Sequence, residues 1–166
     1  MALADTLLPE FDNEMAVTRR VLERAPETAF SWRPHEKSFT LGGLCTHLAN
    51  LPSWGVAILG ADSFDMVRDA PPRAAAQTAV ADVLATFDNF VKDARATLAT
   101  ASDAELLAPW SLKRDGDVIM SMPRMAALRS FTLSHLIHHR GQLSVYLRLQ
   151  NVPLPPIYGP TADEGA

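Results

Sequence analysis

Three of the five histidines in this chain, His135, His138 and His139, lie within one five-residue stretch. On a helix that turns by about 100° per residue, His135 and His139 fall at the middle of an apolar stripe, and His138 falls at its margin. Two imidazoles one helical turn apart can reach the same metal ion. Without an ion, neighbouring core imidazoles repel each other when protonated and lack hydrogen-bond partners when neutral. The pair therefore predicts two ligands of a metal site.

A third candidate ligand, His47, comes from another predicted helix. It is central in an apolar stripe that includes Leu51 and Ile58. In a helix bundle such stripes face each other across the core, where bundle metal sites are built. Together, His47, His135 and His139 would supply three neutral nitrogen ligands and leave one coordination position open. That arrangement is typical of catalytic rather than structural metal sites.

The chemistry expected of such a site depends on the open position. A metal there lowers the pKa of a bound water or a bound thiol, or polarises a carbonyl group. Nitrogen ligands suit zinc, nickel, iron and copper, so the sequence does not select the ion. The alternative is that the three histidines are hydrogen-bonded core residues of a bundle that binds no metal.

Other residues capable of chemistry give weaker signals. Cys45 is two residues from His47 and points to a nearly opposite face of the helix, so it is interpreted as a small packing residue. His138 is expected to hydrogen-bond a neighbouring group or to face solvent, and His35 lies in a predicted loop. No pair of acidic residues identifies a general acid or base. The tryptophans are candidates either for the wall of a pocket or for the core: Trp32, Trp54 and Trp110.

Four amphipathic segments would position these residues. Pro52 lies inside the second segment and predicts a kink or a break there. Pro71 and Pro72 exclude regular structure locally in the connection to the third segment. The segments are expected to be helices over about residues 2–24, 40–59, 76–98 and 123–149.

The remaining stretches connect or cover these helices. Ser102 is predicted to cap a short helical turn, and "RDGD" is a turn signal between two short extended runs, which favours a small hairpin or an irregular loop. The proline-rich tail is expected to pack back on the body through Leu154, Ile157 and Tyr158. Four amphipathic helices without a convincing sheet predict an all-α antiparallel helix bundle, in a single domain over residues 1–166.

Composition and charge exclude several classes of function. The net charge of −4 argues against a nucleic-acid-binding protein with a basic face. The single cysteine excludes an internal disulfide and favours a reducing compartment. The chain begins without a basic leader, and no apolar run approaches the roughly 20 residues that cross a bilayer. We therefore expect a cytoplasmic protein that binds neither nucleic acid nor membranes.

Two stretches and the closing "TADE" carry a family resemblance. The stretches are "SWRPHEKSFTLGGLCTHLANLPSW" at 31–54 and "HLIHHRGQLSVYLRLQNVPLPPIYGP" at 135–160. The most specific part is the pattern HxxxHRGQ followed by YLR and VPLPP. With these motifs the chain resembles the DinB/YfiT-like family of metal-dependent enzymes, while the first and third predicted helices fit only by their apolar pattern.

The resemblance implies a four-helix bundle in up-down-down-up order that is often dimeric, so a homodimer is expected. It also implies a divalent metal ion held by one histidine of the second helix and two of the last. These positions correspond to His47, His135 and His139. Family members with an assigned activity include transferases and isomerases that use low-molecular-weight thiols such as bacillithiol, mycothiol or glutathione.

The leading hypothesis is a metal-dependent enzyme in which water or a thiol attacks a small-molecule electrophile. A thiol-dependent transferase is the favoured version, and metal-assisted hydrolysis is its close variant. Arg33 and Arg140 could hold the carboxylates of a thiol, or they could form surface salt bridges. The alternative function is a non-catalytic metal- or ligand-binding stress-response protein.

Overall fold

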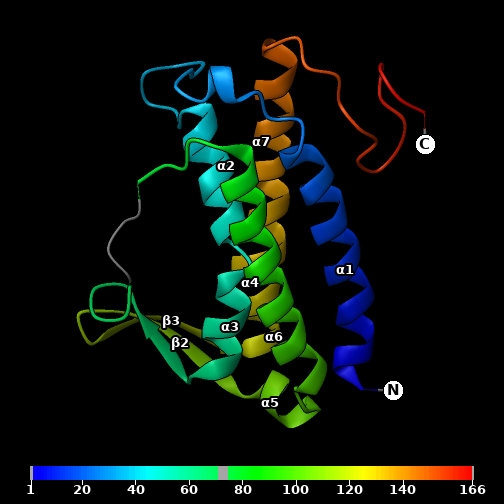
Figure 1. Cartoon of the computed structure of the whole chain (residues 1–166). Helices are drawn as coiled ribbons and strands as arrows, with labels where there is room; N and C mark the ends of the chain where they lie inside the picture. Colours follow the sequence, from blue (N-terminus) through cyan, green and yellow to red (C-terminus); the bar gives the residue numbers. More distant parts are fainter. Residues whose placement is uncertain (1, 71–74, 166) are drawn as a thin grey trace.

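The computed structural model describes residues 2–70 and 75–165. Most of these residues are helical, and a small sheet lies at one end of the long helices (Figure 1). The helical elements are α1 (Leu3–Leu22), η1 (Glu27–Ala29), α2 (Leu41–Asn50), α3 (Ser53–Gly60), α4 (Val80–Thr100), α5 (Asp103–Leu107), α6 (Arg124–Ala127), η2 (Leu128–Ser134) and α7 (His135–Leu149). The strands are β1 (Ser63–Asp65), β2 (Pro109–Arg114) and β3 (Asp117–Pro123).

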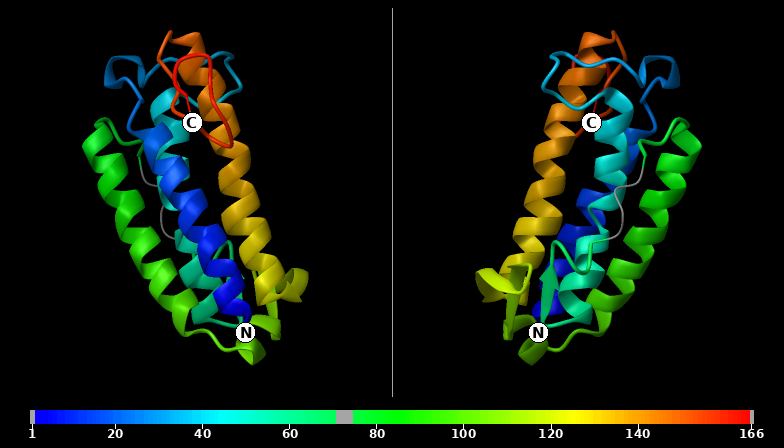
Figure 2. Two further views of the ribbon diagram at one scale, coloured as in Figure 1. Left: turned by 90° about the vertical axis from the view of Figure 1, so that its right-hand side faces the viewer. Right: turned by 90° about the vertical axis from the view of Figure 1, so that its left-hand side faces the viewer.

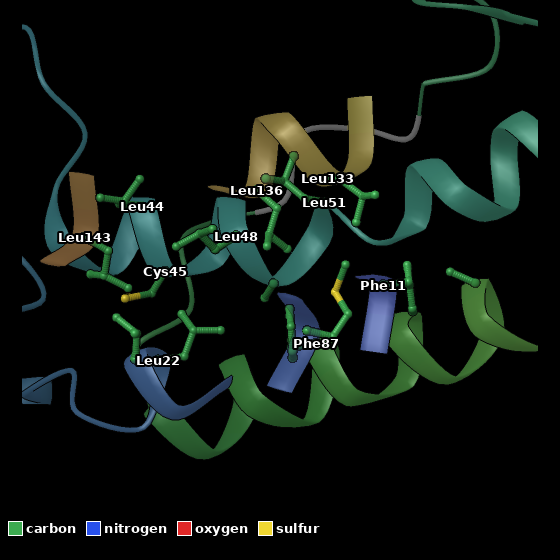
Figure 3. Close-up of a cluster of buried hydrophobic side chains, with 14 of the residues drawn as sticks. Phe11, Leu22, Leu44, Cys45, Leu48, Leu51, Phe87, Leu133, Leu136 and Leu143 are labelled. Carbon is green, nitrogen blue, oxygen red and sulfur yellow. The ribbon is translucent and has the colours of Figure 1, made fainter. Parts of the chain in front are cut away.

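The long helices enclose an apolar core. Helix α1 packs against α4 and α7, and α2 packs against the same two helices, as the two side views in Figure 2 show. Each helix turns one apolar face inward, which removes that surface from water. Figure 3 shows the resulting cluster, to which every long helix contributes: Phe11, Leu22, Leu44, Cys45, Leu48, Leu51, Phe87, Leu133, Leu136 and Leu143.

The predicted second helix is divided into α2 and α3, which confirms a break at Pro52. Proline has no N–H to donate to the carbonyl four residues earlier, so the regular pattern stops there. The chain instead makes a tighter turn, in which the Leu51 amide bonds the Leu48 carbonyl at 3.3 Å. At the other end, Thr40 Oγ1 accepts a hydrogen bond from the Gly43 amide at 3.0 Å and caps α2.

A three-stranded sheet corrects the all-α expectation. The hairpin predicted around "RDGD" is present as β2 and β3, and its turn contains Asp115 and Gly116 with φ of 50° and 93°. The additional strand β1 pairs in parallel with β2, in the order β1-β2-β3. Its three residues are too few to show an alternating pattern, and they become a strand only because the edge of β2 lies beside them.

The other boundaries differ by a few residues from the expectation. Helix α4 begins at Val80, whose amide bonds Glu27 Oε1 at 2.7 Å. Ser102 caps α5 as predicted, through a reciprocal pair of hydrogen bonds with Glu105. Pro71 and Pro72, where the sequence predicts irregular structure, lie outside the described residues.

The last predicted helix is one helical stretch that contains a π-helical turn. Helix α6 follows Pro123, the π-helical segment η2 comes next, and α7 continues to Leu149. A π-helix has more residues per turn than an α-helix, so the wheel of about 100° per residue does not hold across η2. This explains why Leu133, which lies inside η2, joins the core although the wheel did not select it. His135 and His139 follow η2 and keep regular α-helical spacing.

The tail after α7 returns to the body of the protein, as expected. Leu154 is buried and Ile157 packs against the core, whereas the ring of Tyr158 is 67% exposed. No helix among the described residues combines the length and apolar character needed to span a bilayer.

Candidate metal centre

Helices α2 and α7 bring the three candidate ligands together. His47 Nε2 lies 3.3 Å from His135 Nε2, which in turn lies 3.0 Å from His139 Nε2. One ring nitrogen from each residue lies within 4.8 Å of the others, and no further residue joins this cluster in the described part of the chain. The three histidines that the sequence places on facing stripes could therefore hold one metal ion.

One hydrogen bond indicates which nitrogen of His139 carries the proton. His139 Nδ1 lies 2.7 Å from Gln142 Oε1, which can only accept, so Nδ1 bears the hydrogen and Nε2 a lone pair. This Nε2 lies 3.0 Å from His135 Nε2, which in turn lies 3.3 Å from His47 Nε2. Three ring nitrogens that converge in this way could bind one cation together.

Burial keeps both histidines of α7 in the neutral form. Burial is the main cause that lowers the pKa of His135, and neighbouring His139 and His138 lower it further. Burial likewise lowers the pKa of His139, although its hydrogen bond to Gln142 opposes that effect. Neutral imidazole is the form that binds metal, so the site is prepared for an ion at neutral pH.

Gln142 links the candidate ligands to an exposed histidine. Its amide Nε2 donates to His138 Nε2 at 3.1 Å, while its Oε1 accepts from His139. His138 is exposed, and its ring centroid lies 4.8 Å from that of His139. Both expectations for His138 are met, because it faces solvent and hydrogen-bonds a group that holds a candidate ligand. The sequence analysis missed Gln142, whose only signal is its position one turn after His139.

Phe39 covers one side of the site. Its ring stacks on His47 with a centroid distance of 5.4 Å and meets His139 edge-on at 6.1 Å. The Tyr146 hydroxyl donates to the Phe39 carbonyl at 3.3 Å, which ties this loop to α7. Phe39 therefore restricts the access of water to two of the three candidate ligands.

A pocket of about 570 Å³ opens beside His47. It lies between α2, α3 and the segment that contains β1. Of the three tryptophans, Trp54 lines this pocket, whereas Trp110 is fully buried and Trp32 packs edge-on against Tyr146. The described lining residues are Phe39, Gly43, Thr46, His47, Asn50, Leu51, Ser53, Trp54, Ala57, Phe64, Met66, Ala70 and Ala76.

The two arginines considered for a thiol lie outside this pocket. Arg140 is only 1% exposed, which corrects the expectation of a surface residue, and it forms an ion pair with Glu14 at 2.7 Å. Because Arg140 directly follows His139 on α7, it points to a different face of the helix. Arg33 is exposed in the loop before α2.

Cys45 and His35 take the positions that the sequence predicted for them. Cys45 is completely buried, and burial raises the pKa of its thiol to about 12, so it packs in the core as an un-ionised side chain. His35 is exposed in a loop, where its Nδ1 accepts from the Lys37 amide at 3.2 Å.

Comparisons with known proteins agree on one family. The sequence profile of the DinB superfamily matches residues 10–143. The uncharacterised Bacillus subtilis protein YrdA is 25% identical over 168 residues, which cover 98% of this chain and 92% of that protein. A DinB-like protein of Bacillus cereus has a similar fold, with a TM-score of 0.70 and 20% identity over 91% of this chain and 95% of its own. The DinB-like protein YjoA of Bacillus subtilis also has a similar fold, with a TM-score of 0.72. It is 18% identical, and the match covers 92% of this chain and 96% of YjoA.

Proposed function

This chain belongs to the DinB superfamily, and from that premise we propose that it is a metal-dependent enzyme acting on a small molecule. In this proposal His47, His135 and His139 bind one divalent ion, such as zinc, nickel or iron. The observation that supports it is the convergence of one ring nitrogen from each of the three histidines within 4.8 Å, which one cation could bind together. A metal bound there supplies Lewis acidity, which lowers the pKa of a water or thiol and stabilises negative charge developing on a substrate.

The residues around the histidines have separate tasks in this proposal. Gln142 holds His139 in the tautomer whose Nε2 is free to bind an ion. Phe39 keeps water away from one side of the site, and the pocket beside His47 holds the substrate. His47 belongs both to the histidine cluster and to the pocket wall, so a molecule in the pocket lies next to the proposed ion.

The favoured reaction is transfer of a low-molecular-weight thiol to an electrophile. The thiol loses its proton to solvent, its sulfur forms a bond to an electrophilic carbon, and the leaving group departs with the electron pair of the broken bond. Hydrolysis is the close variant, in which water replaces the thiol. The open pocket beside His47 favours an enzyme over a protein that only binds metal, since a binding protein would be expected to close its ligand set.

Metal analysis of untagged protein by mass spectrometry tests the proposed site. We expect near-stoichiometric metal in the wild type and in His138→Ala, and its loss in His47→Ala, His135→Ala and His139→Ala. His138→Ala is the matched control, because it removes an exposed imidazole from the same helix. Folded wild-type protein that neither contains metal nor takes up zinc, nickel or iron when each is supplied would contradict the proposal.

We also propose a homodimeric, cytoplasmic protein that consists of one domain, the four-helix bundle in up-down-down-up order that the resemblance implies. The directions of α1, of α2 with α3, of α4 and of α7 in Figure 1 support that order. Light scattering coupled to size-exclusion chromatography tests the dimer, and a single monomeric species at micromolar concentration would contradict it.

A further inference from the structure

The pocket beside His47 has no charged side chain among its described lining residues. A charged ligand that enters such a pocket loses part of its hydration and gains no ion pair in return. The two arginines considered as partners for a carboxylate do not line the pocket. Arg140 is paired with Glu14, and Arg33 is exposed on its loop. In the metal-free protein, the described residues of the pocket therefore favour a neutral ligand.

Aromatic rings form much of the pocket wall. Trp54 is held by three ring contacts: it stacks on Phe131 at 5.4 Å between centroids and meets Phe64 and Trp110 edge-on at 4.9 Å and 6.5 Å. Phe39 also lines the pocket, and it stacks on His47. Rings that are fixed by their neighbours offer flat apolar surface without losing side-chain freedom when a ligand binds. Such a wall is complementary to another flat ring.

The polar groups of the pocket are mostly acceptors. The Ser53 hydroxyl donates to the Asn50 carbonyl at 2.7 Å, and the Thr46 hydroxyl donates to the Gly42 carbonyl at 2.8 Å, so neither hydrogen is free for a ligand. One amide hydrogen of Asn50 is also engaged, with the Thr46 carbonyl. Within the described residues, Asn50 Oδ1 and Ser53 Oγ accept no hydrogen bond. Oxygens with free lone pairs attract a donor and repel a carboxylate.

From these three features we propose that the pocket binds a neutral aromatic molecule that carries a hydroxyl or N–H donor. Its volume of about 570 Å³ is that of a pocket for a small organic molecule, and it readily admits a ligand of one or two fused rings. The role of this molecule as a substrate rests on the proposed function. Its binding in the pocket is independent of that function. In a thiol transfer, the pocket would then hold the electrophile, and the carboxylates of the thiol would lie outside it.

Calorimetric titration of the metal-free, full-length protein with three matched probes tests the proposal. The probes are naphthol, its methyl ether and naphthoate, which share the ring system and differ in donor and charge. We expect naphthol to bind most tightly, the ether about tenfold more weakly because it has no donor, and naphthoate more weakly still. Naphthoate binding as tightly as naphthol would overturn the proposal.

Substitutions on α3 locate the binding. Ala57 lines the pocket, and its neighbour Val56 is 36% exposed and does not. We expect Ala57→Phe, and the smaller Ala57→Leu, to weaken naphthol binding at least about tenfold by filling the pocket, while Val56→Phe leaves it unchanged. Equal naphthol affinity in folded Ala57→Leu and wild type would place the probe elsewhere and reject the assignment.

The metal content of the same wild-type preparations separates this inference from the proposed function. Protein that binds naphthol in the expected order but takes up no metal supports the pocket assignment and rejects the metal enzyme. Protein that takes up stoichiometric metal but prefers naphthoate in its metal-free form rejects the pocket assignment and leaves the metal site intact.

Discussion

At the scale of single residues, the candidate site depends on one amide side chain. Gln142 accepts from His139 Nδ1 and thereby leaves Nε2 as the nitrogen that faces the other two histidines. Partners of this kind orient metal-binding histidines and increase their basicity. In the proposed site, Gln142 would contribute to metal affinity without touching the ion.

Replacing Gln142 by leucine is therefore expected to weaken metal binding by about 10- to 100-fold, because His139 loses the acceptor that fixes its tautomer. Gln142→Glu keeps an acceptor at the same place and is expected to bind metal at least as tightly as the wild type. Competition with a chromogenic chelator measures both affinities. Equal affinities in the leucine and glutamate variants would show that the hydrogen bond to His139 has no effect on the site.

The sequence identifies the histidines because their signal is local. His135 and His139 are one turn apart on one helix, and His47 is central in its own stripe, so a helical wheel suffices. Gln142 has no such signal, since a glutamine on a helix surface is ordinary. The burial of Arg140 was missed for another reason: its partner Glu14 is 126 positions away along the chain, and no local pattern joins the two.

At the scale of elements, the start of α2 determines where His47 lies. Thr40 caps this helix by accepting from the Gly43 amide. We expect Thr40→Ala to lower the free energy of unfolding by about 1 kcal/mol, and Thr40→Ser to retain most of that stability because its hydroxyl can still accept. Urea unfolding followed by circular dichroism measures the difference. Identical midpoints for the alanine and serine variants would rule out a capping role.

The Asp65 carboxylate accepts several of the hydrogen bonds that hold the segment after β1. Burial opposes the ionisation of Asp65, but amide hydrogen bonds from Val67, Gly116, Asp115 and Arg68 outweigh it and lower the pKa from 3.8 to about 2. Asp65 thus connects the strand that borders the pocket to the turn of the β2–β3 hairpin.

This lowered pKa predicts how acid affects stability. A carboxylate that ionises more easily in the folded state stabilises the protein above its unfolded-state pKa, and this contribution is lost as the pH falls from about 4 to about 2. We expect Asp65→Asn to unfold at lower urea concentration than the wild type at neutral pH, and the difference to narrow towards pH 2. A constant difference across this range would argue against the role of the charge.

Helix caps and helix breaks can be predicted from the local sequence, whereas a short strand with a distant partner cannot. Ser102 with Glu105, and Pro52 within an apolar stripe, are signals contained in a few residues, and both were interpreted correctly. Strand β1 is defined by its pairing with β2 almost 50 residues later, as Ser63 opposite Ser111 shows. A three-residue strand whose partner is that distant cannot be predicted from its own composition.

At the scale of the whole molecule, a buried ion pair joins both ends of the chain. Arg140 on α7 pairs with Glu14 on α1, and the Tyr158 hydroxyl of the tail lies 2.6 Å from Arg140 and 2.9 Å from Glu14. The Tyr158 ring also covers the guanidinium at 5.0 Å. The tail therefore shields this pair from water, although Tyr158 itself is largely exposed.

Removing one charge of this pair should lower the stability of the folded protein. Glu14→Gln is expected to lower the free energy of unfolding by about 3 to 5 kcal/mol, because it leaves the Arg140 guanidinium buried without a counter-ion. Tyr158→Phe keeps the ring and removes only the hydroxyl, and should cost about 1 kcal/mol. Guanidinium chloride unfolding measures both. A Glu14→Gln loss no larger than that of Tyr158→Phe would show that the pair is not important for stability.

The positions of the three histidines along the chain have one more consequence. His47 and His135 are 88 residues apart, and the segment between them contains α3, the entire sheet and α4. An ion bound to both would close this segment into a loop, as a disulfide does, but one that a chelator can open. The proposed cofactor would then act as a removable cross-link, so the cell's supply of metal would set how long the folded chain survives heat and proteases.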